Sequence, residues 1–332
     1  MMTIKSFELD KIRARYINSK KNKSGKAGSV ERREPAIGGV VHASFGAKCI
    51  NEFKIISELK EPRGIAQNDL YFAFSSENKV IIQKGEETFE LENKWFSYIH
   101  ALDFSPFDKH QLLISSSGFD CLFEYDLRTK QPTWDWFAWE HYSNEANDPS
   151  GNTKIYLSRT NDQFEKLISE GKKAKLINPN NEYLPTAMRA AFINSVSFSR
   201  QDRGKVIATL FHEGKSIVID KESKESHDHI TELSNPHGAW QLKKSDLVTS
   251  TSSGKLVHRW NNSETHFDFS GLPGKHIEMG EKEWIQNSIP FGQCIISIDS
   301  NRTSFIIIDP QNKSYNQISY PDHWAVQDFV IL

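Results

Sequence analysis

Two segments of this chain repeat each other, and their pattern decides the fold. The first runs from Ile99-His100-Ala101-Leu102-Asp103-Phe104-Ser105 to Phe123-Glu124-Tyr125-Asp126, and the second from Ile193-Asn194-Ser195-Val196-Ser197-Phe198-Ser199 to Ile217-Val218-Ile219-Asp220. They align without a gap, and each predicts short strands separated by turns. A strand unit repeated along one chain is typical of the blades of a β-propeller. The repeat therefore predicts an all-β propeller.

Other parts of the chain predict further blades of the same kind. Units that begin at Pro62, Pro236 and Ile285 show the same short runs of β-branched and aromatic residues between turn residues. Residues 322–329 predict an opening strand with nothing after it, and residues 37–58 predict strands with no opening strand. Pairing these two segments would close the ring and remove two exposed sheet edges. We therefore expect six blades, or five if the composite blade does not form.

The composition limits the kinds of partner and the compartment. The chain has 332 residues and a net charge of −2, so its bulk charge predicts neither a nucleic-acid nor a membrane partner. Its three cysteines lack CxxC spacing and are expected to be free thiols in a reducing compartment. No apolar run approaches the roughly 18 residues of a membrane span, and no secretory signal is recognised. We expect a cytoplasmic protein.

Two segments fall outside the repeat. Residues 1–34 are basic and polar and are expected to form a partly disordered tail, with residues 35–332 forming the propeller. Residues 131–189 interrupt the repeat and are expected to form a partly helical insertion, with helix-compatible spacing from Asp162 to Lys175. A long excursion from a rigid scaffold often covers or flanks a site, and the alternative is that it only caps the outer surface.

A candidate site lies at the starts of the opening strands. In a propeller these strands line the central channel, so equivalent positions converge on the axis. None of the six positions is apolar: they are Arg63, His100, Asn194, His237, Asn287 and His323. His212, at the exit of a second strand, is expected to join them.

These residue types support three interpretations. In the first, His100, His237 and His323 bind Zn²⁺ or Fe²⁺ through neutral imidazole. In the second, one histidine is a nucleophile or general base, while Arg63, Asn194 and Asn287 orient an anionic substrate. In the third, the residues only bond each other and water in an inert channel. Trp136 and Trp139 would stack on an aromatic or sugar substrate, or else pack between sheets.

Several cofactor classes have no sequence signal here. The chain contains no P-loop, dinucleotide fingerprint, HExxH or GxSxG motif. We therefore expect no nucleotide or flavin, and a divalent metal is the one cofactor under consideration. The expected partner is a small-molecule substrate, and the sequence does not indicate an oligomeric state.

The third blade carries a family resemblance. Phe192-Ile193-Asn194-Ser195-Val196, followed by Phe211-His212-Glu213, resembles the arylsulfotransferase-like branch of six-bladed propellers. That resemblance implies a funnel-shaped axial site and transfer of a sulfuryl group between phenols through a histidine. Phe192 and Phe211 stand where the family motif has His and Arg. Only Asn194 and His212 are therefore carried over as site residues, and the sulfotransferase reaction is not.

Two hypotheses about function follow. The first is an intracellular enzyme that acts on a small anionic or aromatic molecule at a histidine-lined axial pocket, by metal-assisted or histidine-based group transfer or hydrolysis. His100, His212, His237 and His323 would supply ligands or acid–base groups. The alternative is a non-catalytic propeller that binds a protein partner through its rim and its insertion.

Overall fold

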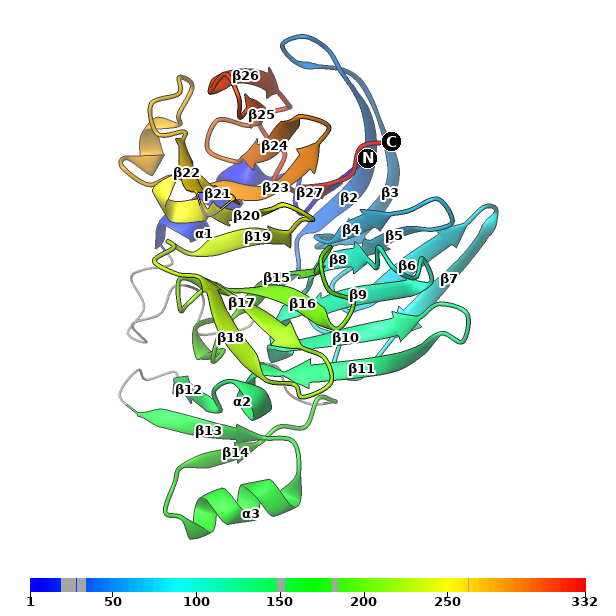
Figure 1. The fold of residues 1–332 in the computed structure, drawn as a ribbon, viewed down its shortest axis with the longest axis vertical. Helices are drawn as coiled ribbons and strands as arrows, with labels where there is room; N and C mark the ends of the chain where they lie inside the picture. Colours follow the sequence, from blue (N-terminus) through cyan, green and yellow to red (C-terminus); the bar gives the residue numbers. More distant parts are fainter. Residues whose placement is uncertain (19–27, 29–33, 148–152, 181–183, 185, 262) are drawn as a thin grey trace.

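Strands arranged around a common centre form the body of the protein. The computed structural model describes residues 1–18, 28, 34–147, 153–180, 184, 186–261 and 263–332. Within them the strands form six sheets of four strands and one sheet of three (Figure 1). No helix in these residues is long and apolar enough to cross a membrane.

Five blades consist of four consecutive antiparallel strands each. Blade 1 is β4 (Ile65–Gln67), β5 (Phe72–Ser75), β6 (Lys79–Lys84) and β7 (Glu87–Glu92); blade 2 is β8 (Ile99–Phe104), β9 (Gln111–Ser116), β10 (Cys121–Asp126) and β11 (Gln131–Phe137). Blade 3 is β15 (Ile193–Phe198), β16 (Lys205–Leu210), β17 (Lys215–Asp220) and β18 (Ser226–Ile230). Blade 4 is β19 (Pro236–Gln241), β20 (Ser245–Ser250), β21 (Lys255–Trp260) and β22 (Ser263–Asp268). Blade 5 is β23 (Ile285–Phe291), β24 (Cys294–Asp299), β25 (Ser304–Asp309) and β26 (Ser314–Ser319).

The sixth blade joins the two ends of the chain. It is β27 (Val326–Phe329), β1 (Met2–Ile4), β2 (Ile37–Phe45) and β3 (Ile50–Lys60), in that order. The N- and C-termini consequently lie side by side (Figure 1). The first strands of the blades contact one another in a complete circle, from β4 through β8, β15, β19, β23 and β27 back to β4. The expected six-bladed propeller, closed by a composite blade, is confirmed.

The N-terminal residues differ from the expected tail. Met2–Ile4 forms the second strand of blade 6, paired with β27 on one side and β2 on the other. Leu9–Asn18 forms helix α1, whose Leu9 and Ile12 are buried against Met279, Trp284 and Ala325. Residues 2–18 therefore belong to the propeller, because their apolar side chains are needed to close it. The basic run Lys20–Lys26 of the expected tail lies outside the described residues.

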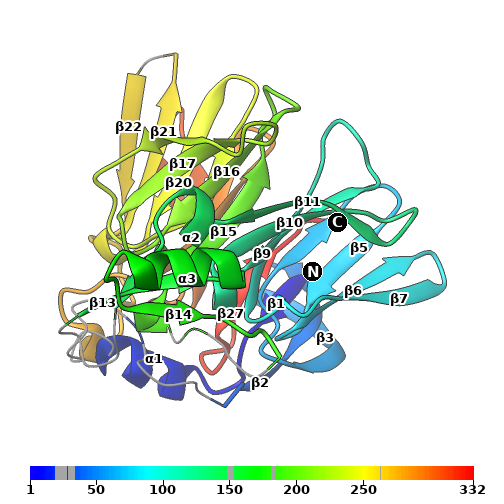
Figure 2. The ribbon, with the colours of Figure 1, turned by 90° about the horizontal axis from the view of Figure 1, so that it is seen from below.

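The insertion begins later than expected. Residues 131–137 form β11, the outer strand of blade 2, because they continue the antiparallel pairing of β10. The excursion starts at helix α2 (Ala138–His141) and contains β12 (Glu145–Asn147), β13 (Lys154–Ser158), helix α3 (Asn161–Ser169) and β14 (Ala174–Leu176). Its small sheet and α3 project from one side of the ring, and Figure 2 shows them from below. The expected helix is shorter than Asp162–Lys175.

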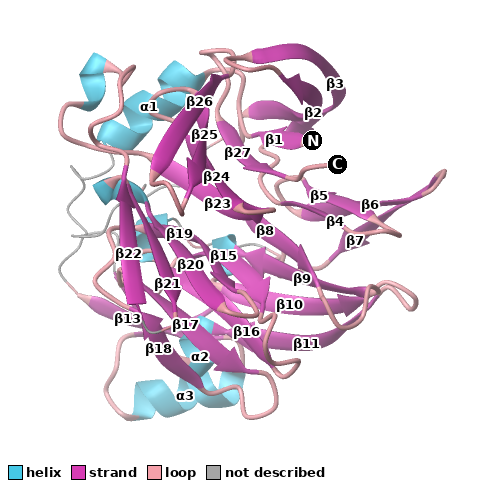
Figure 3. Ribbon diagram, turned by 45° about the horizontal axis from the view of Figure 1, so that its top comes forward, coloured by secondary structure: helices cyan, strands magenta, loops and turns pink. Residues whose placement is uncertain are grey.

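Burial follows the position of each strand within its blade. The middle strands β16 and β17 are buried on nearly every residue, since a neighbouring blade covers each face. The outer strands β22 and β26 have mostly exposed or half-buried side chains. Figure 3 shows the blades fanned around the centre. This packing holds the first strands rigidly and positions their side chains toward the channel.

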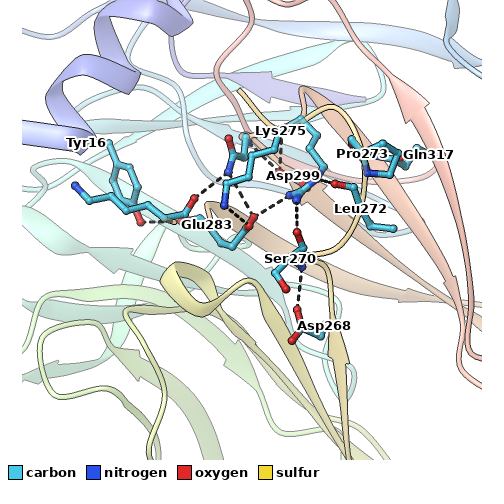
Figure 4. Close-up of polar contacts among 12 residues, drawn as sticks. Tyr16, Asp268, Ser270, Leu272, Pro273, Lys275, Glu283, Asp299 and Gln317 are labelled. Atoms are coloured by element: carbon cyan, nitrogen blue, oxygen red, sulfur yellow. Dashed lines mark hydrogen bonds and ion pairs between the residues drawn. The ribbon is translucent and has the colours of Figure 1, made fainter. Parts of the chain in front are cut away.

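A buried ionic network fastens blade 5 to its neighbours (Figure 4). The guanidinium Nη1 of Arg302 lies 2.8 Å from Glu283 Oε2 and 2.9 Å from Asp299 Oδ2. Lys275 Nζ lies 2.6 Å from the other Glu283 oxygen. On α1, Tyr16 donates from its hydroxyl to the backbone oxygen of Glu283 and stacks on Trp284.

Candidate functional site

The first strands of blades 2, 3 and 4 begin in the same unusual way. Each is preceded by a residue in the left-handed region: Tyr98 (φ 48°), Phe192 (φ 53°) and Asn235 (φ 52°). Non-glycine residues adopt this conformation only when their surroundings hold them in it, and such residues often occur at functional sites. The repeated backbone turn gives the three blades matching entries to the channel.

A β-bulge then directs the second residue of two of these strands. In β8, Ile99 pairs with Ser116 and Ala101 with Ser115, so that His100 is left as the extra residue. In β15, Asn194 is the extra residue in the same way. In β19 the register shifts beside His237, between residues 237 and 239. Bulges re-aim side chains and often lie next to active sites.

His100 and His237 come together as the sequence predicted. Their ring centroids are 5.6 Å apart, and both side chains are buried. His237 Nδ1 is 2.8 Å from the hydroxyl Oγ1 of Thr251, which fixes the orientation of the ring. His100 approaches Phe192 edge to face, at 6.3 Å. The pair is therefore held from both sides.

Three cations surround the two rings. Arg63 and Lys5 share the carboxylate of Glu61, at 2.6 and 3.6 Å. Arg189, from the last part of the insertion, places its guanidinium over the rings of Phe192 and Tyr98, at 4.8 and 5.5 Å. We call His100, His237, Arg63, Lys5 and Arg189 the histidine cluster; all five side chains are buried.

Burial and positive charge keep both imidazoles neutral. Burial is the largest cause of the lowered pKa of His100, and the charges of Arg63, His237, Lys5 and Arg189 lower it further. Burial also lowers the pKa of His237 to about 3, with Arg63 and Lys5 acting in the same direction. A buried cationic ring next to other cations is strongly disfavoured. Both rings are therefore unprotonated at neutral pH, and each has a ring nitrogen with a lone pair that can accept a hydrogen bond or attack an electrophile.

Two N–H donors near the cluster lack hydrogen-bond partners among the described residues. They are Nε of Arg63 and Nδ2 of Asn194, both in buried side chains. The amide oxygen of Asn194 is occupied, since it accepts from Thr209 Oγ1 at 2.6 Å. An unpaired buried donor costs about 1–3 kcal/mol, which a hydrogen-bond acceptor on a ligand would offset.

Three other predicted site residues lie elsewhere. His212 is at the edge of the cluster, where its Nε2 is 2.9 Å from the backbone oxygen of Thr186. Asn287 is turned toward blade 6 and donates from Nδ2 to Asp328 Oδ1 at 2.7 Å. His323 is 59% exposed and lies beside Asp322, three residues before β27 begins.

In two blades the residue at the position of His100 differs from the one that the sequence alignment predicted. The second residues of β23 and β27 are Gln286 and Gln327, which are buried and bonded to each other at 3.2 Å. These residues, and not Asn287 and His323, correspond to His100 in the ring. The sequence alignment missed them because β23 and β27 do not follow the spacing of the repeated segments.

The residues present do not fit the expected metal site. The exposed His323 is not brought to His100 and His237, and among the described residues no group of three or more His, Cys, Asp or Glu side chains could hold a metal ion. The two remaining histidines are surrounded by cations, which would repel Zn²⁺ or Fe²⁺.

The two predicted tryptophans do not line this site either. Trp136 is completely buried, and its Nε1 donates to the backbone oxygen of Lys224, so no face is left for a substrate. Trp139 is buried against Trp95 and Phe137, and it borders a different cavity within the insertion. The ring of Trp136 is packed within the core, whereas Trp139 packs on its aromatic neighbours and also borders the cavity in the insertion.

Several residues of the site were not expected from the sequence. Lys5 comes from the expected tail and Arg189 from the insertion, and neither lies in the repeat. Phe192 and Phe211, which depart from the family motif, pack on each other at 4.8 Å beside His100 and His237. The sequence could have indicated the two phenylalanines as site residues, since they lie next to the predicted Asn194 and His212. No sequence feature indicated Lys5.

Asp120 holds the entry to blade 3 in place. Its carboxylate accepts from the backbone N–H of Ala191 at 2.9 Å and of Ile193 at 3.0 Å, on either side of the left-handed Phe192. We expect Asp120→Asn to lower the free energy of unfolding by about 2 kcal/mol, because an amide donor would face a backbone donor. Chemical denaturation would measure this, with the exposed cap variant Asp202→Asn as control. Equal losses in the two variants would contradict this role of Asp120.

A cavity lies further along the same strands. Its volume is about 650 Å³, and its lining includes Asp103, Asn287 and Asp328 but none of the residues of the histidine cluster. Asp103 is three residues beyond His100 on β8, which corresponds to about 10 Å along a strand. The cavity begins at Ala101 and Ser195, which directly follow His100 and Asn194, and its lining carries the carboxylates of Asp103 and Asp328.

Comparison with known proteins supports the architecture. No protein-family model matches the sequence, and no curated protein matches it. Among solved structures, a crystal structure of a nidogen–laminin complex matches with a TM-score of 0.54 at 10% identity, covering 88% of this chain and 94% of that chain. A streptogramin B lyase structure matches with a TM-score of 0.45 at 9% identity, covering 78% and 82%. The likeness to the nidogen–laminin structure shows the β-propeller fold.

Proposed function

We propose that this protein is an enzyme that acts on a small anionic molecule at the histidine cluster. The observation that carries the proposal is the pair of buried, neutral imidazoles 5.6 Å apart among three cationic side chains. Buried groups with strongly shifted pKa values and specific charged neighbours are typical of functional sites.

The cluster has the features of an anion site. The carboxylate of Glu61 faces the cations Arg63 and Lys5, and Arg189 adds a positive charge that also acts on the buried Asp120. The unpaired N–H groups of Arg63 and Asn194 are donors as well. Anionic oxygens accept charge-assisted hydrogen bonds from such groups, which are about twice as strong as neutral ones.

A bound anion would also prepare the histidines for chemistry. A negative charge beside an imidazole raises its pKa, and a general base is most effective when its pKa approaches the working pH. His237, oriented by Thr251, would take a proton from the attacking group or attack the substrate itself. Arg63 and Lys5 would stabilise the negative charge that develops on the substrate.

The neighbouring rings suit a substrate with an aromatic part. Phe192, Phe211 and Tyr98 border the cluster, and they offer apolar contacts next to the cations. We therefore favour aryl anions among small anionic molecules. The alternative of a module that binds a protein through its rim and insertion stays a prediction, as does the resemblance to the arylsulfotransferase-like branch.

Binding of aryl anions tests the proposal first. Benzoate, benzenesulfonate and phenyl phosphate would be titrated into the full chain by calorimetry, with benzyl alcohol as the neutral control. We expect at least one anion to bind, and Arg63→Met and Lys5→Met each to weaken it about tenfold. The exposed Arg128→Met should not change the affinity. Binding of benzyl alcohol as tightly as the anions would contradict the proposal.

Turnover tests the catalytic part separately. The wild-type protein would be assayed with the 4-nitrophenyl esters of acetate, sulfate and phosphate. We expect His237→Gln and His100→Gln to abolish release of 4-nitrophenol while anion binding persists. The exposed His323→Gln should keep full activity. Turnover that survives in both cluster variants would refute histidine catalysis and leave a binding protein.

A further inference from the structure

The cavity beyond the histidine cluster holds a buried carboxylate that has no cationic partner among the described residues. We name it the carboxylate cavity, and Asp328 and Asp103 lie among its lining residues. Asp328 Oδ1 accepts from Asn287 Nδ2 at 2.7 Å and from the backbone N–H of Phe329 at 2.9 Å. Its partners among the described residues are neutral. A buried carboxylate without an opposite charge is disfavoured in its ionised form, so a cationic ligand would stabilise the ionised form of Asp328.

The charge of the cavity as a whole is negative. The charged residues in its lining are Asp69, Asp103, Asp328 and Arg200. Arg200 is already engaged, since its guanidinium makes hydrogen bonds of 2.6 and 2.8 Å to the two oxygens of Asp103. Asp69, on the rim, pairs with Lys109 at 3.2 Å. Asp328 is therefore the one acidic side chain of the described lining that has no cationic partner.

The remaining walls are largely apolar. Ile65, Leu102, Val196, Ile289 and Phe291 contribute aliphatic and aromatic surface, with Trp240 beside them. Phe291 is half exposed at the rim. The volume of about 650 Å³ falls within the usual range for small-molecule sites. The cavity thus combines an apolar body with a single anionic point.

We propose that the carboxylate cavity binds a small organic cation, an ammonium group on an aromatic or aliphatic body. The ammonium would pair with Asp328, and the body would fill the apolar wall formed by Ile289, Leu102 and Val196. The inference is independent of the proposed function, since no residue of the histidine cluster lines the carboxylate cavity. The two sites would accordingly select ligands of opposite charge.

The ionisation of Asp328 supports this assignment. Burial raises the pKa of Asp328 to about 7, and the charge of Asp103 acts in the same direction, while the bonds from Asn287, Phe329 and Ile65 lower it. A bound cation favours the charged carboxylate and so binds more tightly as the pH rises through 7. The other charged groups facing the cavity are Asp103 on β8, Asp69 after β4 and Arg200 after β15; no histidine is among the described lining residues.

Matched ligands test the proposal with the full chain. Phenethylamine, 2-phenylethanol and phenylacetate share one ring and differ in charge, and saturation-transfer NMR with calorimetry would compare them at pH 8. We expect phenethylamine to bind at least about tenfold more tightly than 2-phenylethanol. Its affinity should rise between pH 6 and 8, and that of 2-phenylethanol should not. An amine that binds no better than the alcohol, or worse than phenylacetate, would overturn the proposal.

Variants locate the binding. Asp328→Asn should weaken phenethylamine about tenfold, while Asp322→Asn removes an exposed carboxylate elsewhere and should have no effect. If Asp328→Asn does not fold, Ile289→Lys places a positive charge in the half-buried wall and should repel the amine to the same extent. Arg63→Met should leave amine binding unchanged, which separates this site from the histidine cluster. Equal weakening in Asp322→Asn and Asp328→Asn, or none in Ile289→Lys, would refute the site.

Discussion

Replacement of Arg302 by Met is expected to lower the free energy of unfolding by about 3–5 kcal/mol, because it removes the cation from a buried ion network. The side chain of Arg302 is fully buried, and its guanidinium contacts both Glu283 and Asp299 (Figure 4). It also donates to the backbone oxygens of Leu272 at 3.0 Å and Ser270 at 3.2 Å. Methionine fills similar space but leaves two carboxylates and two carbonyl groups without these bonds.

Chemical denaturation at pH 7 measures this loss. The matched control is Arg128→Met, which removes an arginine that pairs with Asp126 and Asp108 but is half exposed. Exposed ion pairs contribute at most about 1 kcal/mol, so the control should stay close to the wild-type value. A loss below 1 kcal/mol for Arg302→Met would contradict the contacts of Arg302 with Glu283 and Asp299 in a buried ion network. Because α1 bonds to Glu283 through Tyr16, the N-terminal helix should become more accessible to proteases in the same variant.

The second large effect is on acid stability. The pKa of His237 in the folded protein is lowered to about 3, and that of His100 is also well below its usual value. In the unfolded chain both take up a proton near pH 6.5, whereas the folded protein excludes it. Below pH 6.5 the unfolded state therefore binds more protons than the folded state. The free energy of unfolding then decreases by about 1.4 kcal/mol for each histidine with every unit by which the pH falls. This contribution is complete above pH 6.5.

Two buried carboxylates act in the opposite direction. Burial raises the pKa of Asp328 to about 7 and of Asp299 to about 6. The folded state binds their protons at higher pH than the unfolded state does, so these groups add stability as the pH falls from about 7 toward 4. The pH profile of the wild type alone is consequently ambiguous. The informative quantity is the difference between the wild type and the double variant His100→Gln, His237→Gln.

That difference should depend on pH in one direction. Denaturation from pH 7.5 to 4 should show the double variant gaining stability relative to the wild type below pH 6.5, since glutamine does not titrate. The exposed His323→Gln is the control, and its curve should run parallel to that of the wild type. Parallel curves for the double variant as well would mean that the two rings are protonated or solvated in the folded protein.

Local pattern was enough to predict the blades but not their exact membership. The repeat over residues 99–126 and 193–220 identified two blades, because strand alternation and turn residues are encoded in short stretches. The strand Met2–Ile4 escaped notice because three residues give no periodic signal, and its partners Asp328 and Phe329 are at the far end of the chain. Residues 131–137 belong to blade 2 and not to the insertion because they pair with β10, a contact that the pattern of these residues alone does not reveal.

The candidate site was predicted in part for the same reason. Equivalent positions in the repeat brought His100 and His237 together, since blades of one design place the same position at the axis. His323 was wrong because β27 begins only at Val326, so that Gln327 takes the expected place. No alignment of blades could have supplied Lys5 or Arg189, which come from segments outside the repeat.

The sequence by itself determined the propeller and the pairing of His100 with His237, because both follow from spacing within short repeated units, whereas it left open whether the ring has five or six blades. Only the tertiary structure decided which charges surround the histidine cluster and the carboxylate cavity. Lys5, Arg63 and Arg189 are far apart in the chain and gather around the histidines, while Asp103 and Asp328 line the neighbouring cavity. The physical reason is that ring closure, a contact between the first and last strands, brings these groups to one axis, and electrostatic energy depends on distance in space.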